Sequence, residues 1–408
     1  MVSNAKRIVI VGAGHAGGAL AAHLRQYQFE GSITLVGSEE LPPYQRPPLS
    51  KVCLTGPLNP DELLLRPESF YEQKDIDLLL GTQVIAIDRG KKQVSLAAGA
   101  PINYDFLVLA CGASARELPV AGAQLNGVHH LRTVDDATRL KATLKSTAHL
   151  AIIGGGVIGL EVAASAREMG INVTIIEQQD SLLTRLASPD CSRFFKQLHE
   201  SRGVDFLLGA QVYALHGDNG NVQSVQLQDQ ILPCDAVLVG IGSSPNISLA
   251  QQAGLSCNKG VLVDHNGITS DPNILAIGDM TQRPVLGLTE SICLESVPSA
   301  LEQAKIAASY LAGRPAAKEQ NPWFWSDQYD IKYQVAGLPS LSQESIMRGD
   351  METGSFSIFH FADEQLVAVE SINAPRDFMM ARKAIDTKQS INPELLADNT
   401  KEFKAALA

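Results

Sequence analysis

The chain has 408 residues, which is more than one hydrophobic core usually supports, so we expect two or three domains. Its 33 basic and 44 acidic residues give a net charge of −11, which argues against nucleic acid or an anionic membrane as the main partner. The sequence contains no membrane-spanning apolar run, no signal segment and no CxxC or zinc pattern among its six cysteines. We therefore expect a cytoplasmic protein with reduced thiols and no metal site.

Short apolar and β-branched runs alternate with helical patterns over roughly the first 320 residues. In chain order, the runs are residues 7–12, 32–37, 106–112, 149–156, 172–177, 236–242 and 274–279. Continuous apolar strands of this kind suit parallel sheets that are covered on both faces, so the sequence predicts an α/β fold. The polar stretch 130–146 is expected to be a helix.

The pattern changes after residues 319–330. The segments 333–338, 355–362 and 366–373 alternate between apolar and polar residues, as strands of an antiparallel sheet do, and a C-terminal helix is expected to begin at residues 392–398. We therefore place a domain boundary near Asn321.

Two Gly-x-Gly-x-x-Gly motifs each follow a strand directly and precede a helix. Their glycines are Gly12, Gly14 and Gly17 in the first motif, and Gly154, Gly156 and Gly159 in the second. The first glycine of such a motif allows a tight turn, the second lets the backbone approach a pyrophosphate, and the third lets the helix pack on the strand. One copy is weak evidence, but two copies in this context predict two dinucleotide sites.

Acidic residues near each motif are candidates for sugar contacts. Glu177 ends the strand after the second motif, where a carboxylate accepts hydrogen bonds from the adenosine ribose and favours NADH over NADPH. In the first unit Glu39 comes slightly late, after Ser38. Asp279, which follows Gly278, is either a contact to the ribityl chain of a flavin or the N-cap of a helix.

Several longer motifs resemble the NADH-dependent ferredoxin reductases of oxygenase systems. They include "YQRPPLSK" at 44–51, "LVLACGASARELP" at 107–119, "LESVPSALEQA" at 294–304 and "PWFWSDQY" at 322–329. The resemblance implies two Rossmann-like dinucleotide-binding domains of the glutathione-reductase type plus a C-terminal α+β domain. It implies an FAD-binding domain of residues 1–115 and 247–321, an NADH-binding domain of residues 116–246, and a C-terminal domain of residues 322–408.

The resemblance also implies the reaction. FAD takes electrons from NADH and passes them to an iron–sulfur ferredoxin of the 2Fe–2S kind, which supplies a P450 or a Rieske dioxygenase. Because the chain has no four-cysteine cluster pattern, that carrier must be a separate protein. The paired cysteines of disulfide reductases are missing after the first glycine motif, which argues against disulfide reduction. The alternatives are an NADH oxidase or diaphorase, and an NADH-sensing flavoprotein that resembles apoptosis-inducing factor.

The matching family positions suggest three sets of site residues. Expected FAD contacts are Gly12, Gly14, His15, Ala16, Gly17, Ser38, Glu39, Arg46, Lys51, Val84, Ala110, Gly112, Arg132, Gly278, Asp279, Val297 and Trp325. Expected NADH contacts are Gly154, Gly156, Val157, Ile158, Gly159, Glu177 and Gly242, and Glu161 is expected beside the flavin with Lys51. Ferredoxin is expected to dock near Arg66, Lys305, Trp325, Lys332, Arg382 and Lys383.

Two of these residues have competing interpretations. Lys51 and Glu161 match a lysine–glutamate pair beside the flavin, where they are assigned the catalytic role, but a purely structural ion pair is an equal alternative. Trp325 matches an aromatic residue near the flavin edge, and core packing is its alternative.

The sequence departs from the family pattern at four positions. Ser38 stands where an Asp usually contacts the FAD ribose, and Cys111 replaces the Thr of an "ATG" turn. Cys293 replaces an Arg that many members have, and Val297 stands where some dioxygenase reductases have Trp. The flavin environment and the choice of partner are therefore least certain around these residues.

Overall fold

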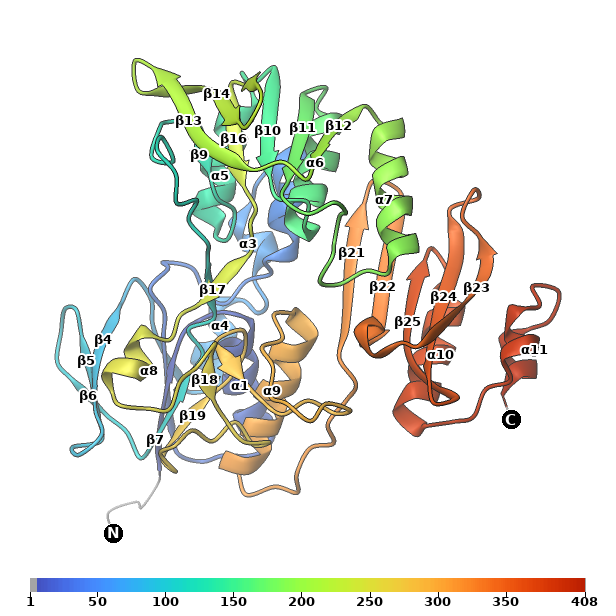
Figure 1. Ribbon diagram of the computed structural model, residues 1–408. Coiled ribbons are helices and arrows are strands. Elements are labelled where there is room, and N and C mark those ends of the chain that lie inside the picture. The colour runs from blue at the N-terminus through green and yellow to red at the C-terminus, as the bar shows by residue number, and fades with distance from the viewer. Residues whose placement is uncertain (1–5, 408) are drawn as a thin grey trace, which may run out of the picture. The chain divides into compact units, whose positions relative to one another are not determined.

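The computed structural model describes residues 6–407, which form two compact units. Unit 1 comprises residues 6–45, 60–114 and 244–322, and unit 2 comprises residues 46–59, 115–243 and 323–407. Many elements of both units are labelled in Figure 1. Each unit contains one of the two glycine motifs.

Unit 1 is built on a parallel sheet with the order β19-β7-β1-β2-β3. Its strands are β1 (Arg7–Val11), β2 (Ser32–Val36), β3 (Ile76–Leu79), β7 (Phe106–Leu109) and β19 (Ile274–Ala276). Successive side chains of a strand point to opposite faces, so the sheet needs a cover on both. Ile8 and Ile10 pack under α1 (His15–Gln26) and α9 (Val297–Leu311), whereas Val9 and Val11 belong to a second core. That second core is closed by the antiparallel strands β4 (Val84–Asp88), β5 (Gln93–Leu96) and β6 (Ile102–Asn103).

Unit 2 repeats this plan with the parallel order β12-β11-β10-β16-β9. Its strands are β9 (Val128–His129), β10 (His149–Ile153), β11 (Asn172–Glu177), β12 (Val204–Leu208) and β16 (Ala236–Val239). Leu150 and Ile152 pack with α5 (Val134–Leu144), α6 (Val157–Glu168) and α7 (Pro189–Ser201). The other face is covered by the antiparallel strands β13 (Val212–Asp218), β14 (Asn221–Leu227) and β15 (Ile231–Pro233).

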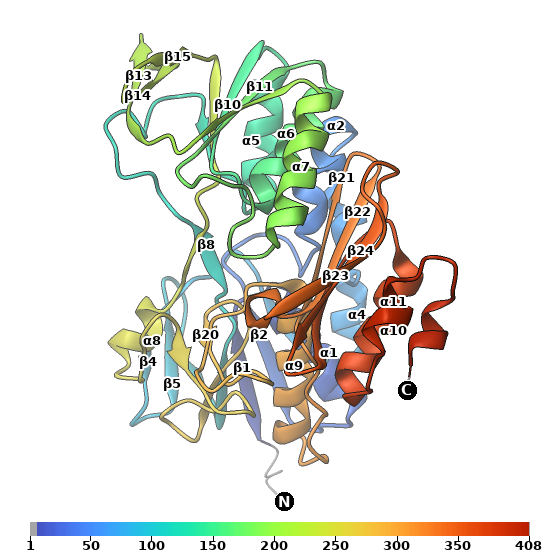
Figure 2. The same ribbon diagram turned by 45° about the vertical axis from the view of Figure 1, so that its right-hand side comes forward.

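The C-terminal part of unit 2 is an antiparallel sheet with the order β21-β22-β25-β24-β23. Its strands are β21 (Trp323–Gln328), β22 (Ile331–Gly337), β23 (Glu344–Asp350), β24 (Ser355–Ala362) and β25 (Gln365–Ile372). Phe359 and Val369 on one face pack against α10 (Pro375–Thr387), which is visible in Figure 2. Tyr333 and Phe356 on the other face contact phenylalanines of α7.

The remaining elements are short. They are η1 (Pro47–Ser50), α2 (Val52–Thr55), α3 (Pro60–Leu63), α4 (Glu68–Gln73), β8 (Ala113–Ala115), β17 (Ser243–Pro245), α8 (Ser248–Gln252), β18 (Val261–Leu262), β20 (Thr281–Gln282), η2 (Pro339–Leu341), α11 (Pro393–Ala397) and η3 (Phe403–Ala406).

The secondary structure confirms most of the sequence-based prediction. All seven apolar runs contain strands of the two parallel sheets, and the 130–146 helix is α5, which begins with a capping box at Thr133. The C-terminal helix is only the five-residue α11, and the longer α10 was not predicted. Within residues 6–407, every helix is too short or too polar to cross a bilayer.

Candidate active site

The first glycine motif has the shape that a pyrophosphate needs. Gly12 has a φ of +115°, and a Cβ atom there would lie 2.2 Å from the carbonyl oxygen of Ala110. A Cβ on Gly17 would lie 2.0 Å from the carbonyl oxygen of Gly12, so helix and strand touch at this point. A Cβ on Gly14, in contrast, would meet nothing within 4 Å. No side-chain cap covers the start of α1 at His15, so this helix N-terminus can favour an anion on that open side.

The second motif repeats this geometry. Gly154 has a φ of +111°, and its Cβ would lie 2.4 Å from the carbonyl oxygen of Gly240. A Cβ on Gly159 would lie 2.3 Å from the carbonyl oxygen of Gly154, whereas a Cβ on Gly156 would again meet nothing within 4 Å. The helix α6 begins at Val157, also without a side-chain cap. The residues of both motifs therefore fit the phosphates of a dinucleotide.

Glu177 lies beside the glycine loop of unit 2. It is the last residue of β11, and its carboxylate accepts hydrogen bonds from the backbone amides of Gly155 at 2.6 Å and Gln179 at 2.8 Å. The side chain is thus held over the glycine loop. Ile158, in the first turn of α6, is exposed on the same unit.

Arg185 is a residue that the sequence interpretation missed. It is exposed, and its guanidinium nitrogen lies 3.2 Å from the place of a Cβ on Gly242, which has a φ of +101°. It lies eight residues beyond the end of β11, too far for the strand-end pattern to suggest it.

Lys51 and Glu161 form an ion pair inside unit 2, with 2.8 Å between Lys51 Nζ and Glu161 Oε1. The Glu161 side chain is only 4% exposed. Two hydroxyl groups also donate to its carboxylate, Ser50 Oγ at 2.5 Å and Ser326 Oγ at 2.6 Å. The buried charge is therefore fully paired, which offsets the cost of taking it out of water. The two serines were not predicted.

The segment 46–59, which carries Lys51, is tied to unit 2 by several further bonds. Ser165 Oγ donates to the Ser50 carbonyl at 2.8 Å, and Lys141 Nζ donates to the Cys53 carbonyl at 2.9 Å. The Arg46 guanidinium donates to the Arg132 carbonyl at 2.5 Å. These predicted FAD contacts, Arg46, Lys51 and Arg132, thus lie in the same unit as the predicted NADH contacts.

The other predicted FAD contacts, Trp325 apart, lie in unit 1. They are the motif glycines Gly12, Gly14 and Gly17 together with His15, Ala16, Ser38, Glu39, Val84, Ala110, Gly112, Gly278, Asp279 and Val297. Ser38 is exposed, and the Glu39 carboxylate accepts from the Tyr44 hydroxyl at 2.6 Å. The N-cap interpretation of Asp279 is wrong, because a turn from Gly278 to Thr281 and then β20 follow it, not a helix.

Trp325 lies on β21 in unit 2 and stacks on Trp323, with ring centroids 5.5 Å apart. The Arg382 guanidinium lies 4.6 Å from the centre of the Trp323 ring. Arg66 and Lys305 belong to unit 1, whereas Lys332, Arg382 and Lys383 belong to unit 2.

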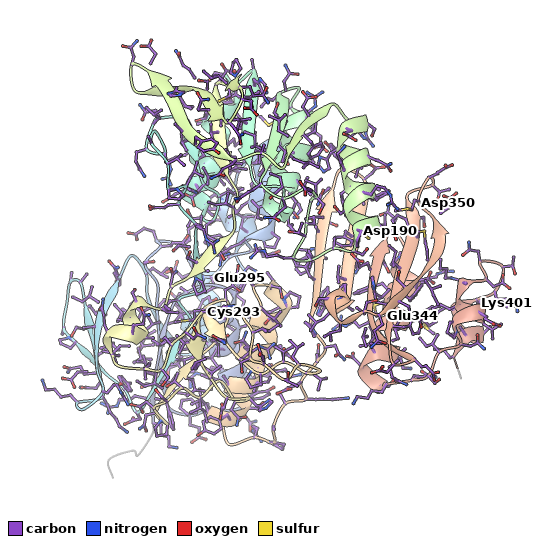
Figure 3. All side chains as sticks on the ribbon, in the orientation of Figure 1. Asp190, Cys293, Glu295, Glu344, Asp350 and Lys401 are labelled. Atoms are coloured by element: carbon purple, nitrogen blue, oxygen red, sulfur yellow. The ribbon has the colours of Figure 1, made fainter. Side chains whose placement is uncertain are left out.

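The cysteines form no disulfide in the described residues. Burial raises the pKa of the Cys111 thiol to about 11, so this group is a neutral thiol at physiological pH. Cys293 lies in the loop before α9, together with Glu295 (Figure 3), and burial, followed by the Glu295 charge, raises its pKa as well.

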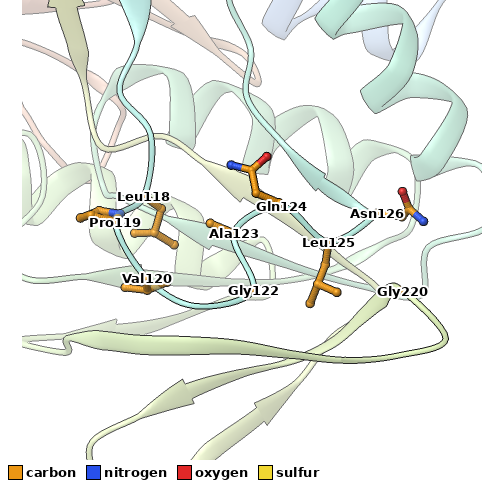
Figure 4. A pocket seen from close by; sticks show the side chains of 9 residues that line it. All are labelled: Leu118, Pro119, Val120, Gly122, Ala123, Gln124, Leu125, Asn126 and Gly220. Carbon is orange, nitrogen blue, oxygen red and sulfur yellow. The ribbon is translucent and has the colours of Figure 1, made fainter.

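A cavity of about 660 Å³ opens between the loop 118–126 and Gly220 in unit 2 (Figure 4). The residues that line it include none of the predicted nucleotide contacts. It is therefore separate from the glycine loop of that unit.

Comparison with known proteins decides the family. Residues 6–307 match the pyridine nucleotide-disulphide oxidoreductase family, and residues 323–407 match the reductase C-terminal family. The chain belongs to the ferredoxin reductases of this family. It is 45% identical to the probable ferredoxin reductase CtmF of Castellaniella defragrans, over 98% of each chain. It is 39% identical to the putidaredoxin reductase CamA of Pseudomonas putida, over 98% of this chain and 96% of the relative.

Solved structures agree. The ferredoxin reductase for the CYP199A2 system of Rhodopseudomonas palustris matches with a TM-score of 0.96 and 38% identity, over 99% of this chain and 100% of the other. The reductase in a covalent putidaredoxin reductase–putidaredoxin complex matches with a TM-score of 0.94 and 38% identity, over 98% of this chain and 99% of the other. The predicted family and fold class are confirmed, and the ferredoxin reductase is an oxidoreductase that uses FAD and NADH.

Proposed function

We propose that this reductase carries electrons from NADH, through FAD, to a separate 2Fe–2S ferredoxin that supplies a P450 or Rieske oxygenase in the cytoplasm. The observation that carries the proposal is the presence of two complete dinucleotide frames in one chain, each with an open second glycine. Relatives named for their carriers support it, among them the rhodocoxin reductase of Rhodococcus erythropolis, 42% identical over 98% of this chain and 94% of the relative.

In this proposal residues 1–115 and 247–321 bind FAD, residues 116–246 bind NADH, and residues 322–408 form the third domain. The amides at the start of α1 and the open side of Gly14 hold the pyrophosphate of FAD, and those of α6 and Gly156 hold the pyrophosphate of NADH. The Glu177 carboxylate accepts hydrogen bonds from the ribose hydroxyls of NADH. Two backbone amides already orient the carboxylate for this role. Asp279 and Glu39 serve the sugar portions of FAD.

Bound FAD supplies the redox chemistry that converts a hydride, which carries two electrons, into single electrons. No side chain can perform this conversion. The task of the protein is to hold the reacting parts and to set the charge around them. Lys51 places a cation beside the flavin, and Glu161 fixes that cation through the 2.8 Å ion pair. A positive charge at this position stabilises electron density that the flavin acquires.

We place the ferredoxin at the basic and aromatic positions Arg66, Lys305, Trp325, Lys332, Arg382 and Lys383. Because the chain has a net charge of −11, an acidic ferredoxin is repelled at long range and needs a local group of cations to dock. Within unit 2, the two neighbouring tryptophans of β21 offer an apolar contact beside Arg382, whose guanidinium lies 4.6 Å from the centre of the Trp323 ring.

The decisive experiment measures NADH-driven reduction of cytochrome c by the purified flavoprotein, with and without an added 2Fe–2S ferredoxin. We expect the rate to depend on the ferredoxin concentration and to saturate. Equal rates without ferredoxin, accompanied by rapid oxygen consumption, would instead identify an NADH oxidase. Slow flavin reduction that leaves a long-lived complex with the nicotinamide would identify an NADH sensor.

A further inference from the structure

A chain of buried polar groups in unit 2 ends at the Glu161 carboxylate. His199 Nε2 lies 2.8 Å from Gln328 Oε1, Gln328 Nε2 lies 3.1 Å from Ser326 Oγ, and Ser326 Oγ lies 2.6 Å from Glu161 Oε1. At the far end the Tyr329 hydroxyl lies 3.4 Å from His199 Nδ1. The chain runs from α7, through β21, to α6.

The burial of these groups makes the chain unusual. His199 and Ser326 are 0% exposed and Gln328 is 1% exposed. Each group must find its partners inside the protein, because a buried polar group without a hydrogen bond destabilises the fold. Their positions are therefore fixed by one another, and a change in one link alters the next.

The charge on Glu161 determines the direction of every hydrogen bond. Its carboxylate, paired with Lys51, can only accept, so the Ser326 hydroxyl must donate to it. Ser326 Oγ is then left to accept from the amide nitrogen of Gln328, which turns the Gln328 oxygen towards His199.

His199 continues the same direction. Its Nε2 must carry a proton to donate to the Gln328 oxygen. Burial lowers the pKa of His199 to about 4, so the ring is neutral at physiological pH and its Nδ1 accepts from the Tyr329 hydroxyl. Every donor thus points towards Glu161, and each bond polarises the next.

We propose that Ser326, Gln328 and His199 are positioning residues for the Lys51–Glu161 pair, and that through it they tune the reduction potential of the bound flavin. The chain fixes Oε1, the oxygen atom that also binds Lys51 Nζ. A carboxylate that loses this support compensates the Lys51 charge less well. The inference deepens the proposed function, since it rests on the placement of the pair beside the flavin.

The test is a spectroscopic redox titration of the FAD-loaded protein and its variants. Lys51→Met removes a cation and should lower the flavin potential, whereas Glu161→Gln leaves that cation uncompensated and should raise it. Each of three chain variants, Ser326→Ala, Gln328→Leu and His199→Phe, should raise the flavin potential, as Glu161→Gln does. The rise should be smaller the further the residue lies from Glu161.

The rate of flavin reduction by NADH provides a second readout. Loss of one hydrogen bond to a charged group corresponds to roughly a tenfold change, so Ser326→Ala should alter this rate by up to about tenfold. Ser326→Thr keeps the hydroxyl and should restore both the potential and the rate.

A matched control separates positioning from general loss of packing. Ser357 and Ser371 form a buried hydroxyl pair at 2.8 Å in the same C-terminal sheet, outside the chain. Ser357→Ala removes a buried hydrogen bond there and should leave the flavin potential unchanged.

The outcomes distinguish the inference from the proposed function. If Lys51→Met and Glu161→Gln shift the potential in opposite directions but the three chain variants do not shift it, the inference is overturned and the proposed function stands. If neither Lys51→Met nor Glu161→Gln shifts it, the pair is not at the flavin, and the inference is overturned together with the placement of this pair, whereas ferredoxin-dependent reduction of cytochrome c still decides the proposed function.

Discussion

The two glycine motifs of this reductase differ at one contact, between the second position of the glycine loop and the end of the next parallel strand. The strand registers align Val11 with Val36 in unit 1 and Ile153 with Ile176 in unit 2. The next residue of the second strand is therefore Gly37 in unit 1 and Glu177 in unit 2. The same position thus has no side chain in unit 1 and carries the Glu177 carboxylate in unit 2.

The neighbouring residue explains the difference. In unit 1 the second position of the motif is Ala13, and a Cβ on Gly37 would lie 2.6 Å from the Cβ of Ala13. In unit 2 that position is Gly155, where a Cβ would lie 3.3 Å from Glu177 and 2.6 Å from Leu182. In unit 1 the Ala13 methyl group thus leaves no room for a Cβ at Gly37, whereas in unit 2 a Cβ on Gly155 would be tight against Glu177 and would clash with Leu182. In unit 1, where the loop carries the methyl group of Ala13, the first acidic residue comes two positions after Gly37, at Glu39, whose carboxylate accepts from the Tyr44 hydroxyl.

The largest expected effect comes from filling the open side of each motif. Gly14→Val should give a folded protein without FAD, because the new side chain occupies the pyrophosphate space but meets no protein atom within 4 Å of its Cβ. Gly156→Val should keep FAD but reduce NADH-driven flavin reduction at least a hundredfold. Absorbance at the flavin band and stopped-flow reduction measure both. If Gly14→Val retains its full FAD content, this would contradict the expectation that the two motifs bind their nucleotides in the same way.

The next prediction tests whether the second residue of each glycine loop and the residue that faces it compete for the same space. Gly155→Ala should raise the KM for NADH at least tenfold, because overpacking of this kind costs about 1–3 kcal/mol. Gly37→Glu should lower FAD occupancy in the same way, and Ala13→Gly in the same chain should restore part of it. Flavin content after desalting reports this rescue. Equal occupancy in the single and double variants would show that Ala13 does not exclude a side chain at position 37.

A smaller effect is expected from the carboxylate itself. Glu177→Ala should raise the KM for NADH about tenfold, since hydrogen bonds to charged groups contribute about 1.5–3 kcal/mol. Glu177→Ser combined with Gln178→Arg should raise kcat/KM for NADPH, because a cation then faces the 2′-phosphate. Steady-state kinetics with both nucleotides provide the measurement. A wild-type enzyme that uses NADH and NADPH equally well would contradict the role of Glu177.

The smallest effect concerns docking, where the two units are compared directly. Charge reversal of Arg66 and Lys305 in unit 1, or of Lys332 and Lys383 in unit 2, should raise the KM for ferredoxin several-fold. Higher salt should reduce the difference, because the screening length is about 10 Å at 0.1 M. Reduction of ferricyanide by NADH is the control and should remain at the wild-type rate. Equal loss in both assays would indicate damage to the fold instead.

Local sequence determined the two parallel sheets and both glycine motifs. The strands in the apolar runs are buried on both faces of their sheets, so their continuous apolar composition alone predicts that they lie in the interior. The same holds for Glu177, because a strand end followed by a glycine loop places the next side chain over that loop. The wrong N-cap interpretation of Asp279 shows the limit of local patterns, since a short turn and a helix start look alike in sequence.

Tertiary structure alone decided how distant segments are joined. Lys51, Glu161 and Ser326 are far apart in the chain, and only the packing of the segment 46–59 and β21 against α6 brings them together. The directed chain from His199 to Glu161 likewise depends on three elements that share no local pattern. A buried polar group forms its hydrogen bond with whichever partner the fold brings close to it. The spacing of residues along the sequence does not reveal which partner that is.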